Sequence, residues 1–284
     1  MNPVKIIECP RDAMQGIRTF IPTESKVKYL QSLLQVGFDT LDFGSFVSPK
    51  SIPQMRDTVD VLDQLDVSAT QTKLLAIIAN VRGATDALKY EQITYLGYPF
   101  SISEHFQMRN TGKTIAESVV VLEAILNLAA IQNKEVVTYL SMGFGNPYGE
   151  PWHMDLVAQW AQKLSDMGVK ILSLSDTIGS ADPKHIYSLF HELIPQFPQI
   201  EWGAHLHTHP SHWFEKVDAA YKGGCLRFDG AIKGYGGCPM AKDDLTGNMP
   251  TEKLLSYFTT QKVETGIQIL HFESAYNEAL QVFG

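Results

Sequence analysis

The sequence predicts an α/β fold, specifically a TIM (β/α)8 barrel that occupies residues 1–284 as a single domain. Eight short β-rich runs recur along the chain, and each is followed by a segment with helical spacing of apolar residues. After the first run the sequence is Pro10-Arg11-Asp12-Ala13, which lacks the glycines of a dinucleotide-binding turn. No Pro/Gly/Ser-rich linker divides the 284 residues, so one barrel fits better than two domains.

The predicted elements alternate regularly from the first strand onward. The first helix, 25–36, ends at Gly37, a residue suited to the left-handed position after a helix. Thr114 and Glu117 have the spacing of a capping box and precede an apolar helix before strand five. The strands are expected at 4–9, 40–45, 74–79, 92–97, 135–142, 170–176, 201–207 and 227–233. The other helices are expected at 52–65, 83–90, 156–167, 183–194, 212–221 and 251–265, with a short extra C-terminal helix at 273–283.

Composition excludes several classes of protein. With 44% hydrophobic and 19% charged residues the chain is neither disordered nor a disulfide scaffold. A formal charge of −8 argues against nucleic acid as a partner, because binding to phosphates requires a positive field. Cys9, Cys225 and Cys238 are too far apart for a paired framework, which favours free thiols in a reducing compartment. No apolar run approaches the length of a membrane span, so we expect a cytoplasmic protein without a membrane partner.

Polar residues gather where the predicted strands end. In a TIM barrel the catalytic residues lie at these carboxyl ends, so chemically useful side chains there carry extra weight. Six of the eight predicted strands carry such side chains at or near their carboxyl ends. The residues concerned are Arg11, Asp12, Asp42, Ser45, Tyr139, Ser141, Asp176, His205 and His207, followed by the glycine-rich run from Gly234 to Pro239.

His205 and His207 form the clearest candidate for a metal site. Side chains at i and i+2 of a strand point to the same side, so both imidazoles are expected to face the barrel interior. Asp12 follows strand one, which lies close to strand seven in a closed barrel. One carboxylate and two imidazoles suit Mg or Mn as well as Zn. The alternative is a structural histidine at a strand end, and His209 and His212 are expected to be loop residues.

Arg11 and Asp42 are expected to act together. A guanidinium beside a metal-binding Asp12 adds positive charge where a carbonyl or enolate oxygen would lie. The alternative for Arg11 is a simple ion pair with a carboxylate at the barrel mouth. We expect Asp42 to orient Arg11 through a salt bridge.

Cys238 and Asn248 follow strand eight, and each has two possible roles. Cys238 lies among glycines in a segment able to close over a site and bring a thiol as proton donor or acceptor, although lone cysteines are more often inert and buried. Asn248 is either the N-cap of the last barrel helix or a metal ligand through its carboxamide oxygen.

Taken together, the motifs resemble the 3-hydroxy-3-methylglutaryl-CoA (HMG-CoA) lyase family of the DRE-TIM metallolyases, over nearly the whole chain and in the family's order. The matching segments are Pro10-Arg11-Asp12-Ala13-Met14-Gln15, Ser45-Phe46-Val47-Ser48-Pro49-Lys50, Pro53-Gln54-Met55, Ser175-Asp176-Thr177-Ile178-Gly179, His205-Leu206-His207, Gly236-Gly237-Cys238-Pro239 and Gly247-Asn248.

The resemblance implies a retro-Claisen cleavage of HMG-CoA to acetyl-CoA and acetoacetate, in which Arg11 stabilises the enolate and Cys238 serves in acid–base chemistry. The first base is left open between Asp12 and His205. A divalent cation, Mg or Mn with Zn as an alternative, is implied, together with an acyl-CoA substrate and a homodimer. The implied metal ligands are Asp12, His205, His207 and Asn248; further catalytic residues are Asp42 and Asp176, and substrate-binding residues are Gln15, Ser45 and Tyr139.

Several positions depart from the family's pattern and bear on substrate identity. Asp42 stands where the lyases usually have Glu, Val137 where they have Arg, and Thr208-His209 where they have Asp-Thr. The loop after Cys238 carries Lys242-Asp243-Asp244 in place of small neutral residues.

The alternatives come from different classes of protein. A sibling aldolase or acyl-transferase, of the isopropylmalate-synthase or hydroxy-oxovalerate-aldolase kind, would share Arg11, Asp12 and the two histidines. A non-catalytic acyl-CoA-binding barrel is another. A zinc amidohydrolase has its HxH motif on the first strand, whereas here the motif lies on the seventh. An acidic chain that binds a CoA thioester needs local positive charge, for which Arg18 and Lys50 are candidates.

Overall fold

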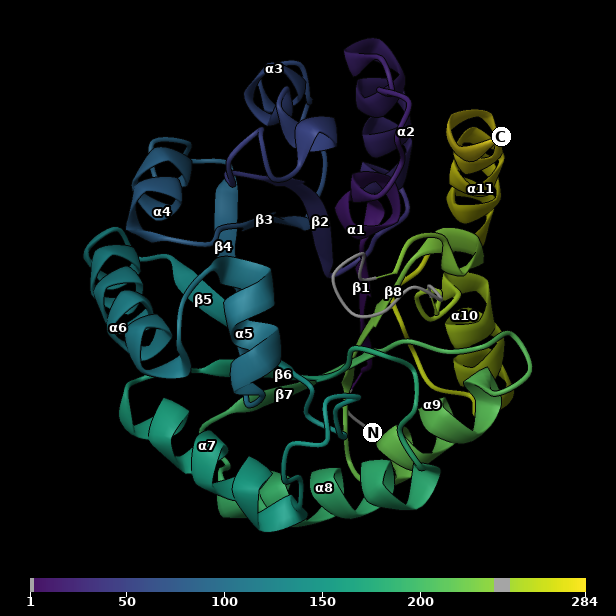
Figure 1. Cartoon of the computed structure of the whole chain (residues 1–284). Helices are drawn as coiled ribbons and strands as arrows, with labels where there is room; N and C mark the ends of the chain where they lie inside the picture. The colour runs from purple at the N-terminus through teal and green to yellow at the C-terminus, as the bar shows by residue number, and fades with distance from the viewer. Residues whose placement is uncertain (1–2, 238–245) are drawn as a thin grey trace.

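The computed structural model describes residues 3–237 and 246–284. Eight parallel strands follow one another around a closed barrel, and β8 pairs with β1 to complete it (Figure 1). This confirms the predicted TIM barrel. The strands are β1 Lys5–Glu8, β2 Thr40–Ser45, β3 Lys73–Ile77, β4 Ile93–Ser101, β5 Glu135–Ser141, β6 Ile171–Asp176, β7 Glu201–Leu206 and β8 Arg227–Gly230.

Helices form the outer ring of the barrel (Figure 1). The described helices are α1 Pro10–Gln15, α2 Thr23–Leu34, α3 Thr58–Leu62, α4 Val81–Ala87, α5 Glu104–Thr111, α6 Ile115–Ile131, α7 Met154–Asp166, α8 Pro183–Gln196, α9 Trp213–Lys222, α10 Thr251–Thr260 and α11 Ile269–Phe283, with 3-10 turns at Pro53–Met55 and Ile232–Gly234. Among the described residues, no single helix has the length and hydropathy of a membrane span; only α5 and α6 taken together reach them, across a bend of 59°.

Local sequence explains where several helices begin and end. Thr114 accepts a hydrogen bond from the amide of Glu117 and the Glu117 carboxylate accepts one from the Thr114 amide, so the predicted capping box at α6 is confirmed. Gly37 adopts φ 89°, and a Cβ there would lie 2.8 Å from the carbonyl oxygen of Gly266. Only glycine therefore fits the turn after α2.

The structure differs from the predicted helices in several places, among them α10, which ends at Thr260, five residues earlier than expected. The helix expected at 52–65 is divided into a 3-10 turn that starts at Pro53 and the five-residue α3. No helix was predicted for the segments that form α1 and α5. The C-terminal helix α11 starts at Ile269, four residues earlier than expected, and packs against α2, where Tyr29 and Phe283 meet edge to face at 5.8 Å.

A small apolar cluster fills the barrel interior below the carboxyl ends of the strands. Its buried members are Leu75, Ile77, Tyr95, Val137, Tyr139 and Ile171. Val137, where the lyase family usually carries an arginine, is thus a fully buried part of this cluster. The cluster forms an apolar support beneath the polar groups described next.

Candidate functional site

A cavity of about 670 Å³ opens at the carboxyl ends of the strands. Val47, Ile77, Pro99 and Phe106 contribute apolar surface to its lining. The polar surface at its base comes from Arg11, Asp12, Gln15, Tyr139, His205 and His207.

Asp12, His205 and His207 form a metal-type centre. One ligand atom from each lies within 4.8 Å of the others, and the Nε2 atoms of the two histidines are 3.3 Å apart. The Thr246 carbonyl lies 3.0 Å from His207 Nδ1, which favours a proton on that nitrogen and leaves Nε2 as a lone-pair donor. The prediction that these three residues converge is confirmed, and their donor set fits a divalent cation.

Charge at this centre is balanced by neighbours. Burial alone would raise the pKa of Asp12, but Arg11 and the two histidines lower it, so the carboxylate stays ionised. Burial likewise lowers the pKa of His207, and the nearby His205 lowers it further, which keeps His207 neutral and able to donate a lone pair. The protonation states of Asp12 and His207 therefore suit metal binding, whereas Asp229 outweighs burial and raises the pKa of His205.

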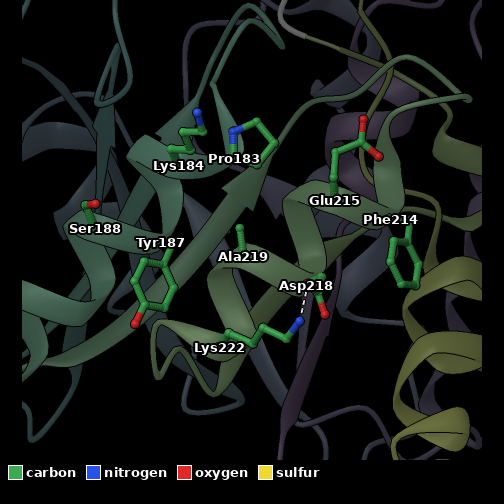
Figure 2. Close-up of a pocket in the computed structure, with 9 residues that line it drawn as sticks. All are labelled: Pro183, Lys184, Tyr187, Ser188, Phe214, Glu215, Asp218, Ala219 and Lys222. Carbon is green, nitrogen blue, oxygen red and sulfur yellow. Dashed lines mark hydrogen bonds and ion pairs between the residues drawn. The ribbon is translucent and has the colours of Figure 1, made fainter.

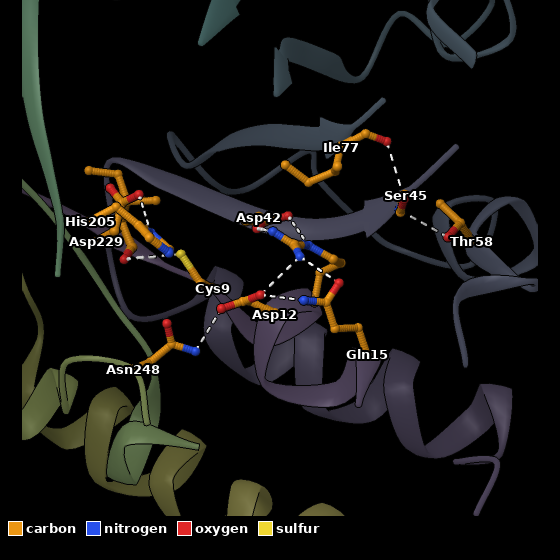
Figure 3. Close-up of polar contacts among 12 residues, drawn as sticks. Cys9, Asp12, Gln15, Asp42, Ser45, Thr58, Ile77, His205, Asp229 and Asn248 are labelled. Atoms are coloured by element: carbon orange, nitrogen blue, oxygen red, sulfur yellow. Dashed lines mark hydrogen bonds and ion pairs between the residues drawn. The ribbon is translucent and has the colours of Figure 1, made fainter. Parts of the chain in front are cut away.

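Asn248 lies beside Asp12, as expected of a residue near the metal, but its orientation differs from the prediction. Its Nδ2 donates to Asp12 Oδ2 at 2.8 Å (Figure 3). The same Nδ2 donates to the Tyr235 carbonyl at 2.9 Å. Ligation through the carboxamide oxygen therefore requires the amide to rotate. The N-cap alternative is wrong, because α10 begins at Thr251 and its N-cap position is Pro250.

Arg11 is held by the side chains of Asp42, Asp12 and Gln15 in a buried network. Its Nε and Nη2 donate to Asp42 Oδ2 at 3.1 and 2.5 Å, and its Nη1 donates to Asp12 Oδ1 at 3.1 Å and to Gln15 Oε1 at 2.9 Å. Burial would lower the pKa of Arg11, but Asp42 and Asp12 raise it, so the guanidinium remains charged. The predicted salt bridge from Asp42 to Arg11 is confirmed.

Gln15 and Tyr139 both line the cavity, as expected for substrate-binding residues. Gln15 Nε2 donates to Asp12 Oδ1 at 2.6 Å. The Tyr139 hydroxyl is buried and has no hydrogen-bond partner among the described residues, and burial raises its pKa well above the usual value. Its ring meets that of His205 edge to face at 5.4 Å, so a neutral phenol lies next to the metal-type centre.

Four of the predicted site residues that the structure describes do not line the cavity: Asp42, Asn248, Asp176 and Ser45. The Asp176 carboxylate is buried behind the wall, where it accepts hydrogen bonds from Lys216 Nζ at 2.6 Å and from the amides of Ser180 and Ala181. The Ser45 hydroxyl bonds to the carbonyl of Ile77 at 3.3 Å. These contacts hold both side chains within the protein, and the catalytic role of Asp176 and the substrate contact of Ser45 stay predictions.

Cys238 and Lys242-Asp243-Asp244 lie outside the described residues. The segment that leads to Cys238 packs directly on α1, because a Cβ at Gly236 would lie 2.6 Å from the carbonyl oxygen of Asp12. Gly236 also adopts φ 86°. Glycine is therefore required at this position for the segment to pass Asp12 closely.

Sequence reasoning missed several residues at and below the cavity. Lys50 lines the rim as expected, but Arg18 does not. Arg109 and Lys113, both at the C-terminal end of α5, supply further positive charge. Asp229 on β8 accepts a hydrogen bond from His205 Nδ1 at 3.0 Å. The sequence does contain a signal for α5, because Ser103 is its N-cap and Gly112 its left-handed C-cap. A helix predicted between these two residues would have placed Arg109 and Lys113 at its C-terminal end. No sequence signal pointed to Asp229, which lies inside β8.

A second hollow lies outside the barrel between α8 and α9 (Figure 2). Tyr187 and Phe214 lie at its edges, and the charges of Asp218 and Lys222 pair with each other at 2.8 Å. None of its lining residues belongs to the metal-type centre. The barrel mouth is therefore the candidate active site.

A closed (β/α)8 barrel with an Asp-His-His centre and a paired arginine at its carboxyl end defines a metal-centred TIM-barrel enzyme. A family model described as HMGL-like matches residues 4–277. The chain belongs to this HMGL-like family.

Similar proteins with known names support this assignment. The hydroxymethylglutaryl-CoA lyase of Bacillus subtilis is 31% identical over 94% of this chain and 88% of its own length. The crystal structure of the B. subtilis HMG-CoA lyase superimposes with a TM-score of 0.90 at 30% identity, covering 98% of this chain and 92% of that one. An HMG-CoA lyase from Acinetobacter baumannii, in complex with coenzyme A and 3-methylmalate, also gives a TM-score of 0.90, at 26% identity over 99% and 91% of the two chains.

Proposed function

We propose that this protein is a divalent-metal-dependent lyase that cleaves HMG-CoA, or a close 3-hydroxyacyl-CoA, to acetyl-CoA and acetoacetate. The observation that carries the proposal is the buried guanidinium of Arg11 next to Asp12, His205 and His207 at the base of one cavity. Relatives named HMG-CoA lyases support it. A non-catalytic barrel is disfavoured, because the charged groups of the site are intact.

Asp12, His205 and His207 would hold the cation, and Asn248 would join them after rotation of its amide. We propose Mg or Mn, since a carboxylate with room for substrate oxygens suits these ions, with Zn as the alternative. When bound, the cation supplies Lewis-acid polarisation of the substrate oxygens that it chelates.

The side chains of this protein would do the remaining work. Cleavage of the C–C bond requires loss of the tertiary hydroxyl proton and leaves negative charge on the thioester oxygen of the departing enolate. Arg11, fixed by Asp42, provides positive charge for that oxygen without rearranging during the reaction. The base is proposed to be Asp12 or His205, and Cys238 is proposed to return a proton to the enolate carbon.

The rim of the cavity suits an anionic coenzyme. Lys50, Arg109 and Lys113 place three cations around the opening of an otherwise acidic protein. The A. baumannii relative binds coenzyme A, which supports an acyl-CoA ligand here. A cytoplasmic location and a homodimer remain proposals.

The experiment is to incubate the Mg- or Mn-loaded protein with HMG-CoA and to measure acetoacetate. A His207→Ala variant, which loses one ligand, is the matched negative control. Release of acetoacetate by the parent protein alone supports the proposal. If the protein converts another 3-hydroxyacyl-CoA or an oxoacid but not HMG-CoA, the proposed substrate is wrong. The assignment to the metal-dependent class of enzymes would still hold.

A further inference from the structure

Asp229 lies directly beneath one of the metal-type ligands. Its side chain is 1% exposed, and its Oδ2 is 3.0 Å from His205 Nδ1 (Figure 3). The other nitrogen of the same ring, Nε2, points to the centre and lies 3.3 Å from His207 Nε2. The imidazole of His205 therefore lies between a carboxylate on one side and the metal-type centre on the other.

This arrangement determines which nitrogen of His205 carries the proton. A neutral imidazole has one N–H and one lone pair, and an ionised carboxylate only accepts hydrogen bonds. The proton must then be on Nδ1, which leaves the Nε2 lone pair facing Asp12 and His207. We propose that Asp229 is a positioning residue that fixes His205 in the Nδ1–H form and so prepares Nε2 for the metal. The inference rests on the metal site of the proposed function.

Arg227 is the neighbouring cation of Asp229 in the buried interior. The two residues are i and i+2 on β8 and so lie on the same side of the strand. Burial would lower the pKa of Arg227, and Asp229 is the main group that raises it. Arg227 Nη1 in turn bonds to Glu201 Oε1 at 3.2 Å. A row of alternating charges thus runs from Glu201 through Arg227 and Asp229 to His205.

Cys9 is the other group close to this pair, since its sulfur lies within 4.8 Å of the ligand atoms of His205 and Asp229. It does not compete for the proton on Nδ1. Burial and the nearby carboxylate of Asp229 raise the pKa of the Cys9 thiol well above its usual value, so it remains a neutral, weak donor.

Asp229→Asn tests the proposal with almost no change in shape. Because Arg227 attracts the amide oxygen, the new NH2 group is expected to face His205 Nδ1 and to donate to it. The ring proton then moves to Nε2, and this nitrogen can no longer bind the metal. We expect calorimetry to show a roughly 10- to 100-fold loss of Mg or Mn affinity. Long-range 1H–15N NMR of the metal-free protein at pH 9 should show His205 change from the Nδ1–H to the Nε2–H form. Thr138→Val, a buried isosteric change on β5, is the matched control and should alter neither.

Wild-type affinity in Asp229→Asn, or a His205 that keeps its Nδ1 proton in the variant, would overturn the proposal. If the variant does not fold, the NMR spectrum of the metal-free wild type decides: an Nε2–H ring, the form that free histidine prefers, refutes the role of Asp229. Neither measurement needs turnover. A protein that fails to cleave HMG-CoA would refute the proposed lyase activity without touching this inference.

Discussion

Asp42 accepts two hydrogen bonds from Arg11, at Nε and Nη2, in a pair whose side chains are only 1% and 9% exposed. Such a fork fixes the plane of the guanidinium as well as its charge. The remaining nitrogen, Nη1, is thereby directed toward Asp12 and Gln15 at the base of the cavity.

Asp42→Ala should cost about 3–5 kcal/mol of unfolding free energy, because it leaves a buried guanidinium without its main partner. We also expect a lower kcat, since the guanidinium loses its fixed orientation. Asp42→Glu retains a carboxylate and should recover most of both quantities. Urea denaturation and acetoacetate assays measure them. Equal stability of Asp42→Ala and the parent would show that Asp12 and Gln15 suffice to hold Arg11.

Removal of the divalent cation by a chelator should abolish activity, and Mg or Mn should restore it. Asp12→Asn should reduce the affinity for the cation, because an amide oxygen is a weaker ligand than the carboxylate it replaces. Calorimetric titration of the metal-free protein provides the measurement. Full activity of chelator-treated, metal-free protein would contradict a role for the cation.

Arg109→Ala and Lys113→Ala should raise KM for the acyl-CoA several-fold and leave kcat nearly unchanged. Both side chains line the same cavity as Arg11 and form no hydrogen bond with Arg11, Asp12 or Gln15 in the structure described. They should therefore bind the ground state and the transition state equally well. Lys184→Ala, in the hollow outside the barrel, is a control of the same type and should change neither constant. A fall in kcat with unchanged KM would exclude a simple binding role for the rim.

Lys216→Met should destabilise the fold by about 3–5 kcal/mol. The Lys216 ammonium is buried, pairs with Asp176 and also donates to the carbonyls of His207 and Gly179. Its loss leaves the buried Asp176 carboxylate without its counter-ion and removes one donor from each of the two carbonyls. Because it supports the backbone of His207, we also expect weaker metal binding. Chemical denaturation tests the first effect, and an unchanged midpoint would contradict a structural role for the pair of Lys216 and Asp176.

Glu8 predicts a pH dependence of stability. Its carboxylate accepts hydrogen bonds from the Ile232 amide at 2.8 Å and the Thr251 hydroxyl at 2.5 Å, and burial raises its pKa from 4.5 to about 8. Between these values the folded protein binds a proton that the unfolded chain has released, so the free energy of unfolding falls as pH rises.

Glu8→Gln removes this proton exchange. As the pH rises from 5 to 9, the wild type should lose on the order of 4 kcal/mol of unfolding free energy through Glu8. The variant should not show this loss, so its stability relative to the wild type should rise by the same amount. Urea denaturation at both pH values measures it. A constant difference between the two proteins across this range would show that the Glu8 carboxyl titrates normally.

Periodic features were predictable from the sequence because they depend on local geometry. The shared face of His205 and His207 follows from strand parity, and the capping box at Thr114 follows from spacing. The convergence of Asp12 with the two histidines required only barrel closure.

Side-chain partners were less predictable, because they depend on packing between segments distant in sequence. Asp176 lies at a strand end, like a catalytic residue, yet Lys216 of α9 holds it behind the wall. Asp229 lies within a short strand, and only its register against β7 brings it to His205. The amide orientation of Asn248 is likewise set by the Tyr235 carbonyl, which no sequence pattern specifies.

The centre also joins the two ends of the chain. Asp12 and Asn248, which bond to each other, are 236 positions apart, and the strands next to them, β1 and β8, form the seam at which the barrel closes. During synthesis on the ribosome the N-terminal half of the site must wait for nearly the whole chain to emerge before its ligand set exists. A cation bound there would link the first βα unit to the last, and it could bind only once the barrel is complete. Its binding energy would therefore stabilise the closed barrel relative to any partly assembled form.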